Sequence, residues 1–449
     1  MKSIIPLSQL LLTALLLPWK VLSFASAFKS PRRWKLPFLT STTTEIPTIS
    51  SEPPSWEDIA SYVGELKEAD PVLTLYRDTN GWCPFCERVW LALEAKKIPY
   101  QERLIDLRNK PDWYNELVPT TLVPAVLFHG DGSTNERKII WESLDVMKAL
   151  DEAFPETPKL ILDSPEYMNA VELQSEVSSA GFAFAFAFRN ETLSDADKLG
   201  RREIFDEALN KLDAALASAG GPFRLGSYFS GIDVIMIPTM ERWRYQLPIT
   251  VMYDILEGRP FVQKWFNAMD DFAPYSRRIA GDEYSWTAAA AQFLRYFGGG
   301  EGKPDVAAAI VRAEDAAKLI TGMFSQVEGT PSKSRAMEAV AKLLSNHDAI
   351  VKDCTRQEPL SQQSIGRADN ENVADKLVRY VSSLLLSNDA FEVARNGPLL
   401  DVDSNERADA AVAARTIAAR LCVPRDMGGP AARILRGTLA IVADRLETI

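Results

Sequence analysis

The residues of this 449-residue chain best suited to chemistry are two cysteines three positions apart, Cys83 and Cys86, in the segment CPFC. A cysteine acts as a nucleophile in its thiolate form. An apolar run at Leu73–Tyr76 precedes the pair and a helical pattern reaching Leu93 follows it, which predicts a strand, a turn and a helix. A thiol at the start of that helix meets unpaired backbone N–H groups and the positive end of the helix dipole, and both stabilise a thiolate.

The two thiols are expected to differ. Cys83 would stand at the very start of the helix, with Pro84 in the first turn, where a missing N–H costs nothing. Cys86 lies three residues further on and shares a helix face with Cys83. We therefore expect Cys83 to be the more exposed and the more readily ionised thiol, and hence the nucleophile.

Inert packing and zinc binding are the alternatives for this pair. A buried cysteine often serves as a small hydrophobic residue, and a CxxC pair can form half of a zinc site. The remaining cysteines, Cys354 and Cys422, and the two histidines, His129 and His347, are isolated in the sequence. Since no second pair stands at metal-ligand spacing, we expect thiol chemistry and no metal ion.

Composition restricts the class of protein. The net charge of −11 argues against a general nucleic-acid binder. Four cysteines in 449 residues do not suggest a disulfide scaffold, and a reducing compartment fits better. The length predicts two or three domains.

The N-terminus has the features of a cleavable signal peptide at residues 1–27. Lys2 supplies the positive start, Leu10–Leu17 the apolar core, and Ala25–Ala27 the small residues of a cleavage site. That apolar core is much shorter than the roughly 20 residues of a membrane helix, so no stable membrane insertion is expected once the signal is removed.

Residues 28–55 have the composition of a transit peptide followed by a linker. Phe28–Thr44 is basic, rich in serine and threonine, and free of acidic residues. Together with the signal peptide, this segment resembles the bipartite plastid-targeting presequence of diatoms and related algae, in which a phenylalanine follows the cleavage site. The plastid stroma is therefore the expected location, with secretion as the second choice.

Residues 71–155 are predicted to form a small α/β domain. Pro124 at a strand start is typical of a cis peptide bond in a functional turn, and the backbone of Val123 beside it can pair with a peptide-like ligand. Glu142 and Ser143 open the last helix, where N–H groups can bind a carboxylate and Glu142 can accept from an ammonium. The expected strands are 73–76, 100–105, 123–129 and 138–140, and the expected helices are 83–96, 110–117 and 142–153.

Four motifs of this domain resemble the cysteine-type glutathione transferases of the lambda and omega classes, with lambda the more similar. They are CPFCERVW at 83–90, IDLRNKPDWY at 105–114, LVPAV at 122–126 and WESLDVMKALDEAFP at 141–155. The resemblance extends over residues 71–280. It implies a thioredoxin-like α/β domain followed by an all-α domain at 159–280, and glutathione as co-substrate.

The resemblance also implies roles for individual residues. Cys83 would form a mixed disulfide with glutathione, above Phe85. Lys110 would meet the glycyl carboxylate, Val123 would pair with the cysteinyl unit before cis Pro124, and Glu142 and Ser143 would hold the γ-glutamyl end. Cys86 departs from these classes, which usually have alanine there, and matches glutaredoxins instead. Monothiol and dithiol cycles therefore both stay open.

The rest of the chain is predicted to be helical. Ser230–Asp233 has the pattern of a helix N-cap. Phe182–Phe188 alternates phenylalanine and alanine as a strand would, but its helical neighbours favour a helix. Beyond a linker at Gly298–Lys303, residues 304–449 form an additional all-α region of unknown role, with helical patterns at 305–324, 334–352, 371–387, 406–421 and 430–446.

These observations predict a glutathione-dependent thiol transferase or reductase. Its reaction would be the removal of glutathione from a mixed disulfide or conjugate, or the reduction of dehydroascorbate. The alternatives are a non-catalytic, glutathione-bound ligand carrier and a protein-interaction platform that uses the C-terminal helices to bind a protein partner.

Overall fold

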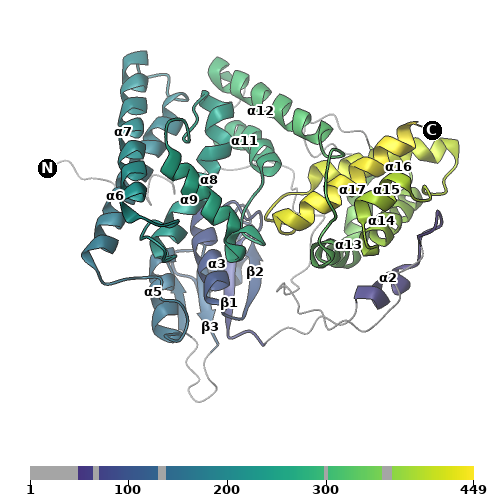
Figure 1. The fold of residues 1–449 in the computed structure, drawn as a ribbon, viewed down its shortest axis with the longest axis horizontal. Helices are drawn as coiled ribbons and strands as arrows, with labels where there is room; N and C mark the ends of the chain where they lie inside the picture. The colour runs from purple at the N-terminus through teal and green to yellow at the C-terminus, as the bar shows by residue number, and fades with distance from the viewer. Residues whose placement is uncertain (1–48, 64–69, 130–137, 298–301, 356–366, 449) are drawn as a thin grey trace.

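The computed structural model describes residues 49–63, 70–129, 138–297, 302–355 and 367–448. It has a thioredoxin-like α/β part, a helical part packed beside it, and a C-terminal helical bundle (Figure 1). The predicted signal peptide, most of the predicted transit segment and most of the predicted linker at 298–303 lie outside the described residues.

A four-stranded mixed sheet forms the α/β part, with strand order β2-β1-β3-β4. Strands β1 and β2 are parallel, while β3 runs antiparallel to both β1 and β4. The four strands are β1 (Leu73–Asp78), β2 (Tyr100–Ile105), β3 (Ala125–Phe128) and β4 (Lys138–Trp141). All four predicted strands are present. The predicted limits of the third, 123–129, were too wide, since Pro124 has no N–H to donate to the ladder.

Helices cover both faces of this sheet. Helices α3 (Pro84–Lys96) and α5 (Ser143–Ala153) lie on one face, where Leu75 joins their core. The short helix α4 (Asp112–Leu117) covers the other face, and there the rings of Tyr76 and Tyr114 pack 5.6 Å apart. Alternate residues of β1 thus enter different cores, as a strand covered on both sides requires.

The helical part shares one hydrophobic core with the α/β part. It contains α6 (Pro165–Ala187), α7 (Asp195–Ala219), α8 (Gly231–Val251), α9 (Pro260–Asp271), α10 (Ala273–Ser276) and α11 (Glu283–Phe297). The predicted helix at Phe182–Phe188 is confirmed as far as Ala187, and the predicted cap at Ser230–Asp233 is confirmed. Asp233 accepts hydrogen bonds from the Ser230 N–H (3.0 Å) and the Trp265 indole N–H (2.9 Å). Helix α11 was not expected.

All five helices predicted beyond residue 304 are present. The C-terminal region contains α12 (Pro304–Gly322), α13 (Lys333–Cys354), α14 (Glu371–Leu386), α15 (Ala390–Asn396), α16 (Ser404–Arg420) and α17 (Gly429–Thr448). Among the described residues of this region, α15 is the only helix that the sequence analysis did not predict. Helix α12 packs on α8 and α11, and the others form a bundle with its own core.

An N-terminal segment completes this bundle. Helix α2 (Trp56–Val63) lies against α13 and α14, far from its sequence neighbours (Figure 1). Ile59 and Val63 enter the bundle core. The Trp56 indole N–H donates to Asp375 at 2.9 Å, and Arg379 donates to the Pro54 carbonyl at 3.1 Å. Residues 49–55, whose composition predicts the end of a transit peptide or a linker, therefore contact the bundle.

The bundle docks on the rest of the molecule through the segment that joins α16 to α17. Tyr284 donates from its hydroxyl to the Ala419 carbonyl at 2.6 Å, and the Ser285 hydroxyl accepts from the Val423 N–H at 2.9 Å. Arg278 donates to the Pro424 carbonyl at 2.5 Å. These polar contacts lie close to the loop before Cys83, because the ring of Pro424 borders Gly81.

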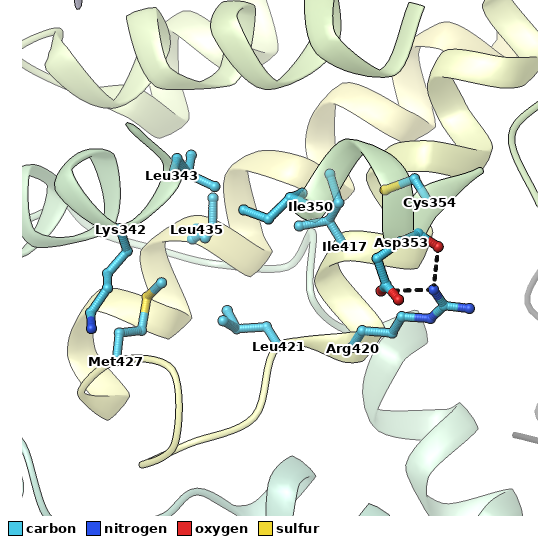
Figure 2. Close-up of a pocket in the computed structure, with 10 residues that line it drawn as sticks. All are labelled: Lys342, Leu343, Ile350, Asp353, Cys354, Ile417, Arg420, Leu421, Met427 and Leu435. Atoms are coloured by element: carbon cyan, nitrogen blue, oxygen red, sulfur yellow. Dashed lines mark hydrogen bonds and ion pairs between the residues drawn. The ribbon is translucent and has the colours of Figure 1, made fainter. Parts of the chain in front are cut away.

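A small cavity lies inside the bundle between α13, α16 and α17 (Figure 2). Its walls include Ile350, Ile417 and Leu435, and the Asp353–Arg420 ion pair (2.8 Å) closes one side. Its volume of about 30 Å³ can hold one or two water molecules, not an organic substrate. Cys354 lines this cavity, and burial raises its pKa to about 12.

Among the described residues, no helix combines the length and the apolar character needed to cross a lipid bilayer.

Candidate active site

The predicted site residues lie together at one end of the strands of the sheet. The pairing of Tyr76 with Ala125, and of Ala125 with Trp141, places the carboxyl ends of β1 and β4 beside the amino end of β3. The parallel β2 finishes at the same end of the sheet. The chain leaves β1 towards Cys83, leaves β2 towards Lys110, enters β3 through Val123–Pro124 and leaves β4 into Glu142–Ser143.

The two thiols differ in exposure as expected. Cys83 is the N-cap residue of α3 and is half-buried, whereas Cys86 is 1% exposed. Burial raises the pKa of Cys86 well above the ordinary thiol value, and its neighbours Cys83 and Asp78 add to the shift. Cys83 is therefore the thiol that can meet a substrate, and Cys86 holds its proton tightly.

A guanidinium lies close to the exposed thiol. Arg88 stacks on the ring of Phe85, with 5.0 Å between the guanidinium carbon and the ring centre. Burial lowers the pKa of Arg88 to about 10, and the nearby Cys83 and Glu87 oppose that shift. Arg88 therefore places a partly desolvated positive charge near the Cys83 sulfur. Sequence analysis missed Arg88, because a single arginine in a helix is commonplace.

Sequence reasoning also missed Asp78. This residue ends β1 and is 2% exposed. Its Oδ2 accepts from the Trp82 N–H at 2.8 Å, while its Oδ1 is buried without a hydrogen-bond partner in the part of the chain that the structure describes. A carboxylate oxygen of Asp78 and the sulfurs of Cys83 and Cys86 all lie within 4.8 Å of one another.

The turn before β3 has the predicted backbone. The Val123–Pro124 peptide bond is cis, and the Tyr114 hydroxyl donates to the Leu122 carbonyl at 2.6 Å, which anchors the turn. Within the described residues, neither backbone group of Val123 has a hydrogen-bond partner. These groups are available to pair with an extended ligand.

The start of α5 is strained. Glu142 is exposed and has φ 70° and ψ 119°, a conformation that non-glycine residues rarely adopt. Such strain costs about 1–3 kcal/mol and tends to persist at functional sites. Ser143 follows as the first residue of α5 and is 5% exposed. The free N–H groups of this helix start suit a carboxylate.

Lys110 lies on the loop between β2 and α4. It is half-buried, and burial lowers its pKa. Among the described residues, its ammonium group makes no hydrogen bond or ion pair. A partly desolvated cation of this kind suits an anionic ligand group.

Buried charges connect α3 to α8. Glu87 of α3 pairs with Arg242 of α8, with 2.8 Å between Oε2 and Nη1. Arg242 also donates to the Trp82 carbonyl at 2.9 Å, directly before Cys83. The adjacent Glu241 accepts from the Tyr275 hydroxyl (2.5 Å) and the Trp286 indole N–H (2.9 Å).

Glu241 should make the protein less stable as the pH rises. Burial, with the nearby Glu87 adding to it, raises its pKa from 4.5 to about 8. Between these values the folded chain keeps a proton that the unfolded chain has released, so the free energy of unfolding should fall from about pH 5 to about pH 8. Urea unfolding across this range should show a shallower fall for Glu241→Gln than for the wild type. An unchanged slope would contradict the assignment, and substitution of the exposed Glu172 by glutamine is the control.

The chain is similar to known proteins over the α/β part and the helical part. Residues 82–153 match the family described as glutathione S-transferase, N-terminal domain. The chain is 35% identical over 207 residues to "Probable glutathione S-transferase DHAR1, cytosolic" of Oryza sativa subsp. japonica, across 46% of this chain and 88% of that protein. It is 33% identical over 199 residues to "Glutathione S-transferase L2, chloroplastic" of Arabidopsis thaliana, across 43% of this chain and 62% of that protein. Among solved structures, the dehydroascorbate reductase of Chlamydomonas reinhardtii matches 46% of this chain and 92% of its own at 23% identity, with a TM-score of 0.39.

Proposed function

Since the chain belongs to the glutathione S-transferase family, we propose that it is a glutathione-dependent thiol transferase or reductase in which Cys83 is the nucleophile. The observation that carries this proposal is the half-exposed Cys83 at the N-terminus of α3, next to the Arg88 guanidinium. Removal of glutathione from mixed disulfides and reduction of dehydroascorbate are the two reactions that such a thiol supports. The second is the reaction named for the solved relative from Chlamydomonas.

In the proposed reaction the Cys83 thiolate attacks the glutathione sulfur of a mixed disulfide. That S–S bond breaks, a Cys83–glutathione disulfide forms, and the other sulfur leaves as a thiolate that takes up a proton. The thiolate of a second glutathione then attacks the enzyme-bound glutathione sulfur, which releases oxidised glutathione and restores Cys83.

Cys86 offers a second way to complete the cycle. Its sulfur can attack Cys83, displace glutathione and form a Cys83–Cys86 disulfide that two further glutathione molecules reduce. Because burial raises the pKa of Cys86, this route needs an acceptor for its proton. The carboxylate of Asp78, which has an oxygen within 4.8 Å of both sulfurs, is a candidate.

The proposed glutathione site uses the residues at the strand edge. The free backbone of Val123, before cis Pro124, pairs with the cysteinyl unit, and Lys110 meets the glycyl carboxylate. The N-terminus of α5 at Ser143 binds the γ-glutamyl carboxylate, and Glu142 accepts from its ammonium. Phe85 packs below the thiol and holds Arg88 in place by stacking.

Serine substitutions test the nucleophile and the route of resolution. Cys83→Ser should lower glutathione-dependent reduction of a small mixed disulfide by about 100-fold or more, since a hydroxyl is a far weaker nucleophile at neutral pH. Cys86→Ser should retain activity in a monothiol cycle and lose it in a dithiol cycle. Cys354→Ser, in the distant bundle cavity, is the control. A Cys83→Ser protein with wild-type activity would contradict the proposal.

Ser143→Ala tests the glutathione site. Loss of one hydrogen bond to the γ-glutamyl carboxylate should raise KM for glutathione roughly 10-fold, which corresponds to about 1.4 kcal/mol, with little change in kcat. Ser218→Ala, an exposed serine of α7, should leave both constants unchanged. A fall in kcat alone would argue against a binding role for Ser143.

We also propose a plastid location. The presequence composition and the chloroplastic relative from Arabidopsis support it. A fluorescent protein fused after residue 60 should accumulate in plastids of a diatom host, and deletion of residues 1–27 from the fusion should leave it in the cytosol. Export of the intact fusion into the medium would favour secretion instead.

A further inference from the structure

We propose that Asp78, Cys83 and Cys86 form a binding site for a zinc ion. The two sulfurs and a carboxylate oxygen of Asp78 lie within 4.8 Å of one another. Sequence spacing alone had argued against zinc because it offered only two ligands. The fold supplies the third, since β1 ends in Asp78, whose carboxylate lies close to the two sulfurs at the start of α3.

The spacing of the three ligand atoms suits a tetrahedral ion. Zinc–sulfur bonds of about 2.3 Å place two sulfurs of one tetrahedral site roughly 3.8 Å apart, and zinc–oxygen bonds are about 2.0–2.2 Å. Ligand atoms already within 4.8 Å of one another need to move by no more than about 1 Å to reach these separations. Cys83 and Cys86 are joined by the first turn of one helix, so their backbone need not change.

Asp78 supplies an independent indication of a ligand. Its Oδ1 is buried and has no partner among the described residues, while the Oδ2 of the same carboxylate is held by the Trp82 N–H at 2.8 Å. An unpaired carboxylate oxygen is costly inside a protein. A cation bound by Oδ1 and the two sulfurs would remove that cost, and the hydrogen bond to Oδ2 would hold the carboxylate in place.

The exposure of the ligands leaves one coordination position open. Cys86 and Asp78 are buried, whereas Cys83 is half-exposed and borders solvent. Three protein ligands plus one open position is the arrangement that zinc adopts where it also takes water or a small ligand. Binding releases the protons of both thiols, so the affinity should rise with pH. Two thiolates, a carboxylate and Zn²⁺ leave one net negative charge, which Arg88 faces.

Zinc at this position would occupy both thiols and block their reaction with disulfides. Zinc binding needs only the reduced thiols and the carboxylate, and so does not depend on the proposed reaction. An enzyme of the proposed type would be reversibly inhibited by zinc and restored by a chelator.

Cobalt serves as the optical probe. Titration of the reduced, metal-free full chain with Co²⁺ should produce thiolate-to-cobalt charge-transfer absorption at one ion per chain, and Zn²⁺ should abolish it. Cys83→Ser and Cys86→Ser should each remove the absorption. Asp78→Asn, which keeps an oxygen to accept from the Trp82 N–H, should weaken Co²⁺ binding about 10-fold or more. Cys422→Ser and Cys354→Ser are the matched controls and should bind as the wild type does.

Three results would overturn the proposal. They are absence of charge-transfer absorption in the reduced wild type, equal affinity of Asp78→Asn and wild type, and loss of binding in either control variant. Oxidation of the wild type to the Cys83–Cys86 disulfide should abolish binding and reduction should restore it, which tests the site without any substitution that affects folding. Disulfide reductase activity of the metal-free protein, measured separately, tests the proposed function, so failure of one proposal is distinguishable from failure of the other.

Discussion

Strand β3 lies antiparallel between β1 and β4, and the arrangement of the candidate site depends on this pairing. If β3 ran in the opposite direction, Val123 and Pro124 would enter the sheet at the edge remote from Cys83. The observed register places Ala125 between Tyr76 and Trp141. As a result, four segments that lie up to about 60 residues apart in the sequence meet at one end of the sheet. Each contributes a different kind of group: a thiol, a cation, a free backbone and a helix N-terminus.

Burial makes chemically similar groups near the candidate site differ in their exposure to solvent. The two thiols belong to one helical turn, yet Cys83 reaches solvent and Cys86 does not. The same effect acts on the carboxyl groups behind the site. Burial raises the pKa of Glu87, although it pairs with Arg242, and it also raises the pKa of the neighbouring Glu241, to about 8, where the donors are neutral. The protonation of these two carboxyl groups thus depends on the packing of α3 against α8.

The local features of the site could be predicted because they are encoded locally. A proline at a strand start indicated the cis turn, the spacing of apolar residues indicated α3, and Ser230–Asp233 indicated the start of α8. Asp78 and Arg88 could not be predicted, since their importance comes from where tertiary packing places them relative to the two sulfurs. The sequence analysis did not predict α11, although its residue pattern is helical. It also did not predict α2 and α15, because both helices are short. The contact of α2 with the bundle has no sequence signal, because it joins residues 319 positions apart.

That long-range contact has a consequence for how the molecule is made. Residues 49–63 leave the ribosome among the first of the described residues, but their packing partners, α13 and α14, emerge roughly 300 residues later. Until then the apolar side chains of Ile59 and Val63 have no core to enter. The α/β part and the helical part pack against each other and can fold before the bundle is complete. The bundle can be completed only after α13 and α14 have been made. It then joins the start of the described chain to its end, with the α/β part and the helical part as the loop between these two segments.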